Sequence, residues 1–142
     1  MVSAPSLSEY DLTIVGAGPA GLTASLRAIE NHLKYLTIEG EEIGGTVAKY
    51  PRQKLVMTSP VEFPLYGRFK KMELPKENLM EFWSKVMKRG DFRCRTGEKV
   101  EDVTKDKDGV FTVTTTKGVH RACYVVLALG KTGTPRKLGV KG

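Results

Sequence analysis

Cysteine and histidine are scarce in this chain of 142 residues. The two cysteines, Cys94 and Cys123, are far apart in the sequence, and the two histidines, His32 and His120, are likewise isolated. Such spacing provides neither a disulfide framework nor a local cluster of metal ligands. We therefore expect both cysteines to be reduced packing residues, and we expect no metal site.

Long apolar runs are missing as well. The longest one, residues 124–129, is far too short to cross a bilayer. The first residues, MVSAPSLSEYD, contain neither the basic start nor the apolar core of a secretory leader, and they do not resemble a mitochondrial presequence. These absences predict a cytoplasmic protein without a membrane partner.

The charge is unbalanced, because 23 lysines and arginines face 16 acidic residues and give a net charge of +7. A basic excess of this kind can serve nucleic-acid binding, which would weaken steeply with salt. The basic residues, however, occur in scattered pairs such as Lys88 and Arg89, without interleaved aromatics. We therefore favour a solvated surface and expect no nucleic-acid partner.

The N-terminal part shows the alternation of one strand, one helix and a second strand. Residues 10–15 are rich in Leu, Ile and Val, apolar positions recur at helical spacing over 19–34, and 35–40 form a second apolar run that ends at an acid. This order predicts a βαβ unit with a right-handed crossover. The length of the chain allows one domain of this kind and no second full domain.

The remainder of the sequence alternates between irregular and regular segments. Residues 40–74 contain many glycines and prolines, which predicts a long loop that covers a ligand. Four aromatic residues in this loop are expected to anchor it on the core more than to cover a ligand; they are Tyr50, Phe63, Tyr66 and Phe69. We further predict a helix over 75–89, an antiparallel meander over 98–123 and a strand over 124–130 that is buried on both faces.

Three glycines between the first strand and the first helix form the pattern G-x-G-x-x-G. Gly16 permits a tight turn, Gly18 lets the backbone approach a pyrophosphate, and Gly21 lets the helix pack closely on the strand. Glu39 follows at the end of the second strand, where a carboxylate accepts hydrogen bonds from ribose hydroxyls and repels a 2′-phosphate. The pattern predicts a dinucleotide site but does not choose between NAD and FAD. A turn that only packs the helix is the alternative.

The wording VGAGPAGLTA, with Pro19 and Ala20 between the glycines, resembles the FAD-binding fingerprint of the pyridine nucleotide-disulfide oxidoreductases, above all the thioredoxin-reductase-like branch. The resemblance implies an α/β, Rossmann-like FAD/NAD(P)-binding fold, in which an antiparallel β-meander accompanies a parallel sheet. FAD is then the implied cofactor. Two further segments resemble family motifs, EEIGGTVAKYPRQ beside the flavin and VVLALGKTGTPRKLGV with its Thr134-Pro135 pair. The additional site residues implied are Gly40, Gly44, Gly45, Thr46, Val100 at the adenine, Ala128 and Gly130.

The sequence departs from the family at the redox centre. In the glutathione-reductase-like branch a redox cysteine follows the Gly-Gly-Thr segment, but Val47 stands there, and no cysteine precedes Cys94. We therefore assign no catalytic residue. The resemblance implies that residues 1–142 are the first segment of the FAD-binding domain of a flavin-dependent, NAD(P)H-linked oxidoreductase. A non-catalytic module that binds FAD or NAD, or an interaction module, is the alternative.

The end of the sequence leads to one more expectation. The chain stops near the point where the family's chain enters its NAD(P)H domain, and the closing FAD segment is also absent. A fragment of this kind would leave apolar surface uncovered. We expect it either to bind FAD weakly or to form a homodimer through that surface.

Overall fold

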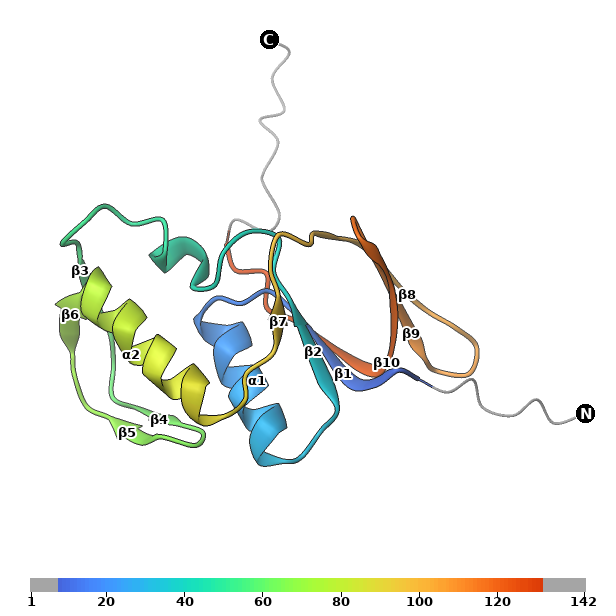
Figure 1. Ribbon diagram of the computed structural model, residues 1–142, viewed down its shortest axis with the longest axis horizontal. Helices are drawn as coiled ribbons and strands as arrows, with labels where there is room; N and C mark the ends of the chain where they lie inside the picture. Colours follow the sequence, from blue (N-terminus) through green and yellow to red (C-terminus); the bar gives the residue numbers. More distant parts are fainter. Residues whose placement is uncertain (1–7, 132–142) are drawn as a thin grey trace, which may run out of the picture.

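A computed structural model describes residues 8–131 and shows a six-stranded mixed sheet at the centre of the molecule (Figure 1). The strand order is β7-β2-β1-β10-β9-β8. The strands are β1 (Tyr10–Val15), β2 (Tyr35–Ile38), β7 (Cys94–Arg95), β8 (Val100–Lys105), β9 (Phe111–Thr115) and β10 (Gly118–Leu127). β7, β2, β1 and β10 run parallel, whereas β8 and β9 are antiparallel to their neighbours.

The first three elements form the predicted βαβ unit. β1 and β2 pair in parallel, and helix α1 (Pro19–Glu30) connects them. Ser25 on the helix reaches Thr37 on β2 through a buried hydrogen bond of 2.7 Å between their hydroxyls. The helix is shorter than the predicted 19–34, because His32 adopts a left-handed φ of 56° and turns the chain back toward β2.

The meander predicted over 98–123 is present, but the last strand differs from the prediction. β10 is one continuous strand, whose first half pairs antiparallel with β9 and whose second half pairs parallel with β1. The expectation that residues 124–130 are buried on both faces is wrong, since Tyr124 is 70% exposed and Leu127 is 62% exposed. The reason is that pairing with β9 ends at Ala122, so that β1 is the one strand beside 124–127 within the described residues.

The loop predicted over 40–74 is present over 40–54, but the prediction is wrong for the residues from Leu55 on, which contain short strands. After a short 3-10 turn η1 (Gly45–Val47), the chain forms two small antiparallel pairs that follow one another along a ribbon (Figure 1). They are β3 (Leu55–Met57) with β6 (Glu73–Pro75), and β4 (Val61–Phe63) with β5 (Gly67–Phe69). We call residues 54–75 the ribbon. It lies beyond α2, on the side of the molecule away from the sheet.

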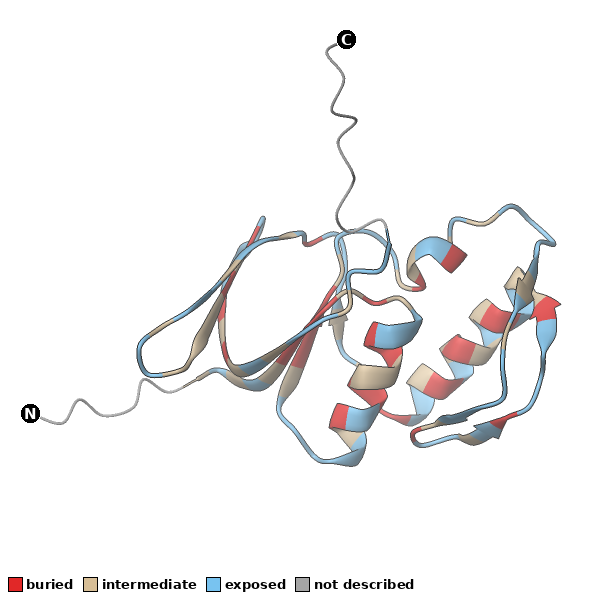
Figure 2. Cartoon of the chain, turned by 180° about the vertical axis from the view of Figure 1, so that it is seen from behind, coloured by how far each residue is buried: buried red, intermediate tan, exposed pale blue. Residues whose placement is uncertain are grey.

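Helix α2 (Lys76–Arg89) joins the ribbon to the rest of the molecule. Its Leu79 and Trp83 are buried in one cluster with Leu22 of α1 and Phe69 of the ribbon. Phe82 contacts ribbon aromatics, including Phe69 with ring centroids 4.6 Å apart. Figure 2 shows buried residues along both helices and in the central strands. The aromatic residues of the ribbon therefore anchor it on α2, as the sequence favoured.

Candidate functional site

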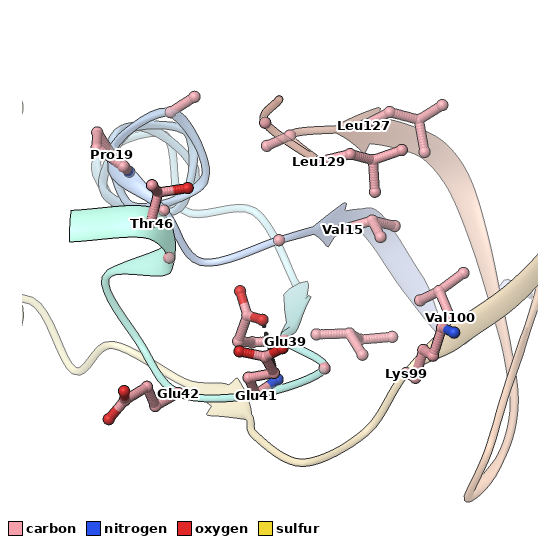
Figure 3. A pocket seen from close by; sticks show the side chains of 18 of the residues that line it. Val15, Pro19, Glu39, Glu41, Glu42, Thr46, Lys99, Val100, Leu127 and Leu129 are labelled. Carbon is pink, nitrogen blue, oxygen red and sulfur yellow. Dashed lines mark hydrogen bonds between the residues drawn. The ribbon is translucent and has the colours of Figure 1, made fainter. Parts of the chain in front are cut away.

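A cavity of about 860 Å³ opens at the carboxyl ends of the parallel strands β1, β2 and β10. Ligands of open α/β sheets bind at this edge, and the volume lies within the usual range for small-molecule sites. Figure 3 shows Pro19 and Thr46 on one side of the cavity, and Leu127 and Leu129 on another. Glu39 lies below both groups in this view, and its carboxylate is hydrogen-bonded to the Ala17 amide in the glycine turn.

Two glycines of the turn are required by the packing of the protein itself. Gly16 has a left-handed φ of 104°, and a Cβ there would lie 2.3 Å from the carbonyl oxygen of Ala128. A Cβ on Gly21 would lie 1.8 Å from the carbonyl oxygen of Gly16. Both contacts are far shorter than real atoms allow, so that β1, α1 and the end of β10 approach this closely only around glycine.

Gly18 is different, because no close contact requires it to be a glycine. Its φ of −75° and ψ of −172° suit any residue, and the nearest atom to a built Cβ is the Cα of Gly45 at 4.0 Å. The position lines the cavity together with Pro19 and Ala20. No side chain caps the first turn of α1, whose amides and positive dipole end lie here. The free space beside Gly18 therefore suits an anionic group.

Glu39 is held toward the turn by two backbone amides. Its Oε2 accepts a hydrogen bond of 2.7 Å from the Ala17 amide, and its Oε1 accepts one of 3.0 Å from the Glu41 amide. An ionised carboxylate has about four acceptor positions. Each oxygen thus keeps capacity for a further donor from the cavity, such as a hydroxyl group.

Charged residues that the sequence analysis did not assign also line the cavity. Glu41 and Glu42 follow Glu39, while Lys49 comes from the segment after η1 and Lys99 from the segment before β8. Lys49 forms an exposed ion pair with Glu41. The hydrogen bond between the two side chains raises the pKa of Lys49. The run of acidic residues after β2 is visible in the sequence. No sequence pattern indicates Lys99, because it reaches the cavity only when the chain returns after β7.

Most of the residues predicted for the site come together around this cavity. Gly21 and Gly44 do not line it: Gly21 packs against the turn, and the Gly44 amide donates to the Ala17 carbonyl oxygen at 2.8 Å. The Thr134-Pro135 pair lies outside the described residues. The predicted residues that line the cavity are Gly16, Gly18, Pro19, Ala20, Glu39, Gly40, Gly45, Thr46, Val100, Ala128 and Gly130. Their contacts with a cofactor stay predictions.

The two cysteines are free and lie on different strands, Cys94 on β7 and Cys123 on β10. Burial raises the pKa of the Cys94 thiol to about 12, with a smaller contribution from the charge of Glu39. A thiol with so high a pKa is protonated at neutral pH and is a poor nucleophile. Within residues 8–131 no group of side chains is arranged to hold a metal ion, and no helix is long and apolar enough to span a membrane.

Comparison with solved structures supports the fold assignment. The bacillithiol disulfide reductase Bdr from Staphylococcus aureus matches with a TM-score of 0.77 at 23% sequence identity, over 96% of this chain and 43% of that one. At this identity the likeness concerns the fold. The Rossmann-like α/β fold implied by the family resemblance is confirmed.

Comparison with known sequences places the chain more narrowly. A ferredoxin–NADP reductase from Limosilactobacillus reuteri is 34% identical over 136 residues, and a thioredoxin reductase from Treponema pallidum is 32% identical over 139 residues. These matches cover 94% and 95% of this chain but only 38% and 39% of the relatives, so the chain spans well under half their length. The family model for pyridine nucleotide-disulphide oxidoreductases matches residues 13–142. The chain therefore belongs to the pyridine nucleotide-disulphide oxidoreductase family.

Proposed function

We propose that residues 1–142 form the first segment of the FAD-binding domain of a flavin-dependent, NAD(P)H-linked oxidoreductase of the thioredoxin-reductase-like kind. The observation that carries the proposal is the open space beside Gly18. Packing accounts for glycine at 16 and 21 but not at 18, where the free volume belongs to the cavity. A diphosphate that approaches the backbone closely accounts for the third glycine.

The charges around the cavity support the orientation of the cofactor. The amino end of α1 favours the diphosphate, and Glu39 has acceptor capacity left for the ribose hydroxyls of the adenosine half. Val100, at the start of β8, lines the cavity, and we assign it to the adenine. The flavin half then extends along the remaining predicted residues, Gly45, Thr46, Ala128 and Gly130.

The chain's own residues bind, orient and shield, and they do not form a redox pair. Bound flavin supplies the hydride and electron transfer in such enzymes. Val47 follows Thr46 at the position where one branch of the family has a redox cysteine, and Cys94 is a half-buried thiol with a raised pKa. Electrons therefore pass to an acceptor outside residues 1–142, with NAD(P)H as the reductant of the whole protein.

The direct experiment is a titration of the chain with FAD, FMN and NAD, followed by flavin absorbance and fluorescence and by calorimetry. We expect FAD to bind more tightly than FMN, which lacks the adenosine half, and more tightly than NAD. Glu39→Gln should weaken FAD binding by about tenfold, the loss of one charge-assisted hydrogen bond. It should leave the affinity for FMN unchanged.

A matched control separates the role of Glu39 from the general acidity of the site. Glu42 also lines the cavity, but Figure 3 shows its carboxylate directed away from Glu39. Glu42→Gln removes the same charge and should leave FAD binding nearly unchanged. A protein that prefers NAD to FAD would contradict the flavin assignment and favour a nucleotide-binding module. Equal losses in the two variants would contradict the ribose contact.

A further inference from the structure

The carboxylate of Glu98 is buried outside the cavity that we propose for FAD. Glu98 is 2% exposed and does not line the cavity. Its Oε1 accepts hydrogen bonds from the Thr115 hydroxyl at 2.6 Å and from Nε2 of His120 at 2.9 Å. Its Oε2 lies 3.9 Å from the Arg95 guanidinium. Burial of an unpaired charge costs much free energy, and the partners of Glu98 reduce this cost. A paired charge in the interior suggests that the Glu98 side chain has a specific role.

The backbone around Glu98 holds Glu39 from both sides. The Glu39 amide donates a hydrogen bond of 2.8 Å to the Arg95 carbonyl oxygen, and the Glu98 amide donates one of 3.0 Å to the Glu39 carbonyl oxygen. The Gly97 amide adds a bond of 3.2 Å to the carbonyl oxygen of Glu41. The segment 95–98 thus grips the stretch that presents the Glu39 carboxylate to the cavity.

Other backbone interactions of this segment lie at its ends, where Arg95 pairs with Ile38 on β2 and Lys99 exchanges hydrogen bonds with Thr116. Arg95 and Thr96 are exposed, and Gly97 takes a left-handed φ of 61°. Glu98 is the buried side chain of the segment, and through Thr115 on β9 and His120 on β10 it connects to the meander. The next residues, Lys99 and Val100, line the cavity directly. The Glu98 side chain is therefore the buried link between the segment that holds Glu39 and the meander.

His120 is itself enclosed on every side. It is 5% exposed, the Tyr10 ring contacts it edge-on at a centroid distance of 6.3 Å, and the Glu9 carboxylate lies 3.9 Å from its Nδ1. Its ring is thus held in place from β1 as well as from the segment 95–98. A side chain held in this way gives Glu98 a rigid donor.

We propose that Glu98, held by His120 and Thr115, is a positioning residue that sets the placement of Glu39 and Val100 and thereby the affinity of the adenosine end of the cavity. This inference rests on the proposed FAD site, because Glu98 acts through Glu39 and never touches the ligand. Glu98 acts by geometry, since the charge that matters for the ribose is that of Glu39.

The test combines amide hydrogen exchange with FAD titration. Glu98→Ala should accelerate exchange of the Glu39 amide by at least about tenfold more than that of Ile14 in the central strand, because local opening no longer requires global unfolding. The same variant should weaken FAD binding by about tenfold. Glu98→Gln keeps an oxygen that accepts from Thr115 and His120, so it should restore most of both losses.

A control variant excludes a general effect on stability. Val86→Ala opens a space among buried side chains of α1, α2 and the ribbon, none of which belongs to segment 95–98, and lowers the stability of the fold. It should change the exchange of Glu39 and Ile14 in parallel and leave FAD affinity unchanged. If Val86→Ala and Glu98→Ala change Glu39 exchange and FAD affinity alike, the proposal is wrong. It is equally wrong if Glu98→Ala leaves both readouts unchanged.

Two further variants apply if Glu98→Ala does not fold. His120→Leu removes the donor to Glu98, while His120→Gln keeps an N–H group, so the first should reproduce the loss and the second should repair it. Failure of the proposed function has a distinct signature. If the wild-type chain does not bind FAD but Glu39 exchange still depends on Glu98, the positioning of Glu39 stands and the cofactor assignment falls.

Discussion

The glycines of the turn fall into two kinds that the motif does not distinguish. Gly16 and Gly21 face carbonyl oxygens at distances that exclude a Cβ, whereas Gly18 faces the cavity with no protein atom closer than 4.0 Å to that position. The first kind serves the fold and the second serves a ligand. The comparison teaches that a binding motif contains residues with separable roles, which substitution by alanine can resolve.

The largest effect is expected at Gly16. Alanine there would require both a strained left-handed φ and a displacement of the end of β10 away from Ala128. We expect Gly16→Ala to lower the free energy of unfolding by about 3 kcal/mol or more, measured by chemical denaturation. A variant with wild-type stability would show that Gly16 is not a packing glycine.

Gly18→Ala should produce the opposite pattern. The free energy of unfolding should change by about 1 kcal/mol or less, since alanine is only a poorer helix cap than glycine. The added methyl group would, however, occupy the space of the diphosphate, and we expect affinities for FAD and ADP to fall by about a hundredfold in titrations.

Gly118→Ala is the matched control for Gly18→Ala. A Cβ at Gly118 meets no atom within 4 Å, and one at Gly18 meets only the Cα of Gly45 at 4.0 Å, but Gly118 starts β10 and does not line the cavity. It should leave the affinities for FAD and ADP unchanged. Wild-type FAD affinity in Gly18→Ala would remove the main support for the proposed function.

The buried carboxylate of Glu98 predicts a pH dependence of the unfolding free energy, of intermediate size. Burial raises the pKa of Glu98, but the hydrogen bonds from Thr115 and His120 and the nearby positive charges outweigh it, so that the pKa lies below its ordinary value. The resulting stabilisation is complete above the ordinary glutamate pKa of about 4.3 and is lost as the pH falls below it.

Unfolding curves of the wild type and of Glu98→Gln between neutral pH and about pH 3 measure this effect. We expect the difference in unfolding free energy between the two proteins to shrink as the medium becomes more acidic. Glu42→Gln is the control, because it removes the same charge from an exposed carboxylate. A constant difference for Glu98→Gln would contradict the pairing inferred for the buried carboxylate.

The smallest effect is expected at the exposed rim of the cavity. Lys49 and Glu41 form a solvent-exposed ion pair, and such pairs contribute little to stability. We expect Lys49→Ala to leave the free energy of unfolding unchanged within error at physiological salt, as measured by thermal denaturation. A clear loss of stability would mean that the pair ties the turn η1 to the segment after β2.

Much of the site could be predicted because its determinants are local. The strand, the three glycines and the helix are consecutive, and the end of β2 must lie beside the end of β1 once a right-handed crossover joins two parallel strands. Glu39 is therefore placed by sequence order. The meander was predictable for the same reason, since short turns join strands of clear alternation.

The ribbon and the exposure of the last strand were not predictable in this way. The strands of the ribbon are only three residues long and are interrupted by Pro60 and Pro64, so that their pattern is that of a loop until α2 offers a surface to pack against. The apolar run 124–127 predicts burial, but burial depends on which strands pair beside it.

By itself, the sequence determined the glycine turn, the acid that follows it and the family to which they belong, because local sterics and chain order dictate these features. Only the tertiary structure decided which glycine faces the cavity, that Lys99 joins its wall and that Glu98 stands buried behind Glu39. These relations depend on segments distant in the chain, and such contacts form only when the whole sheet assembles.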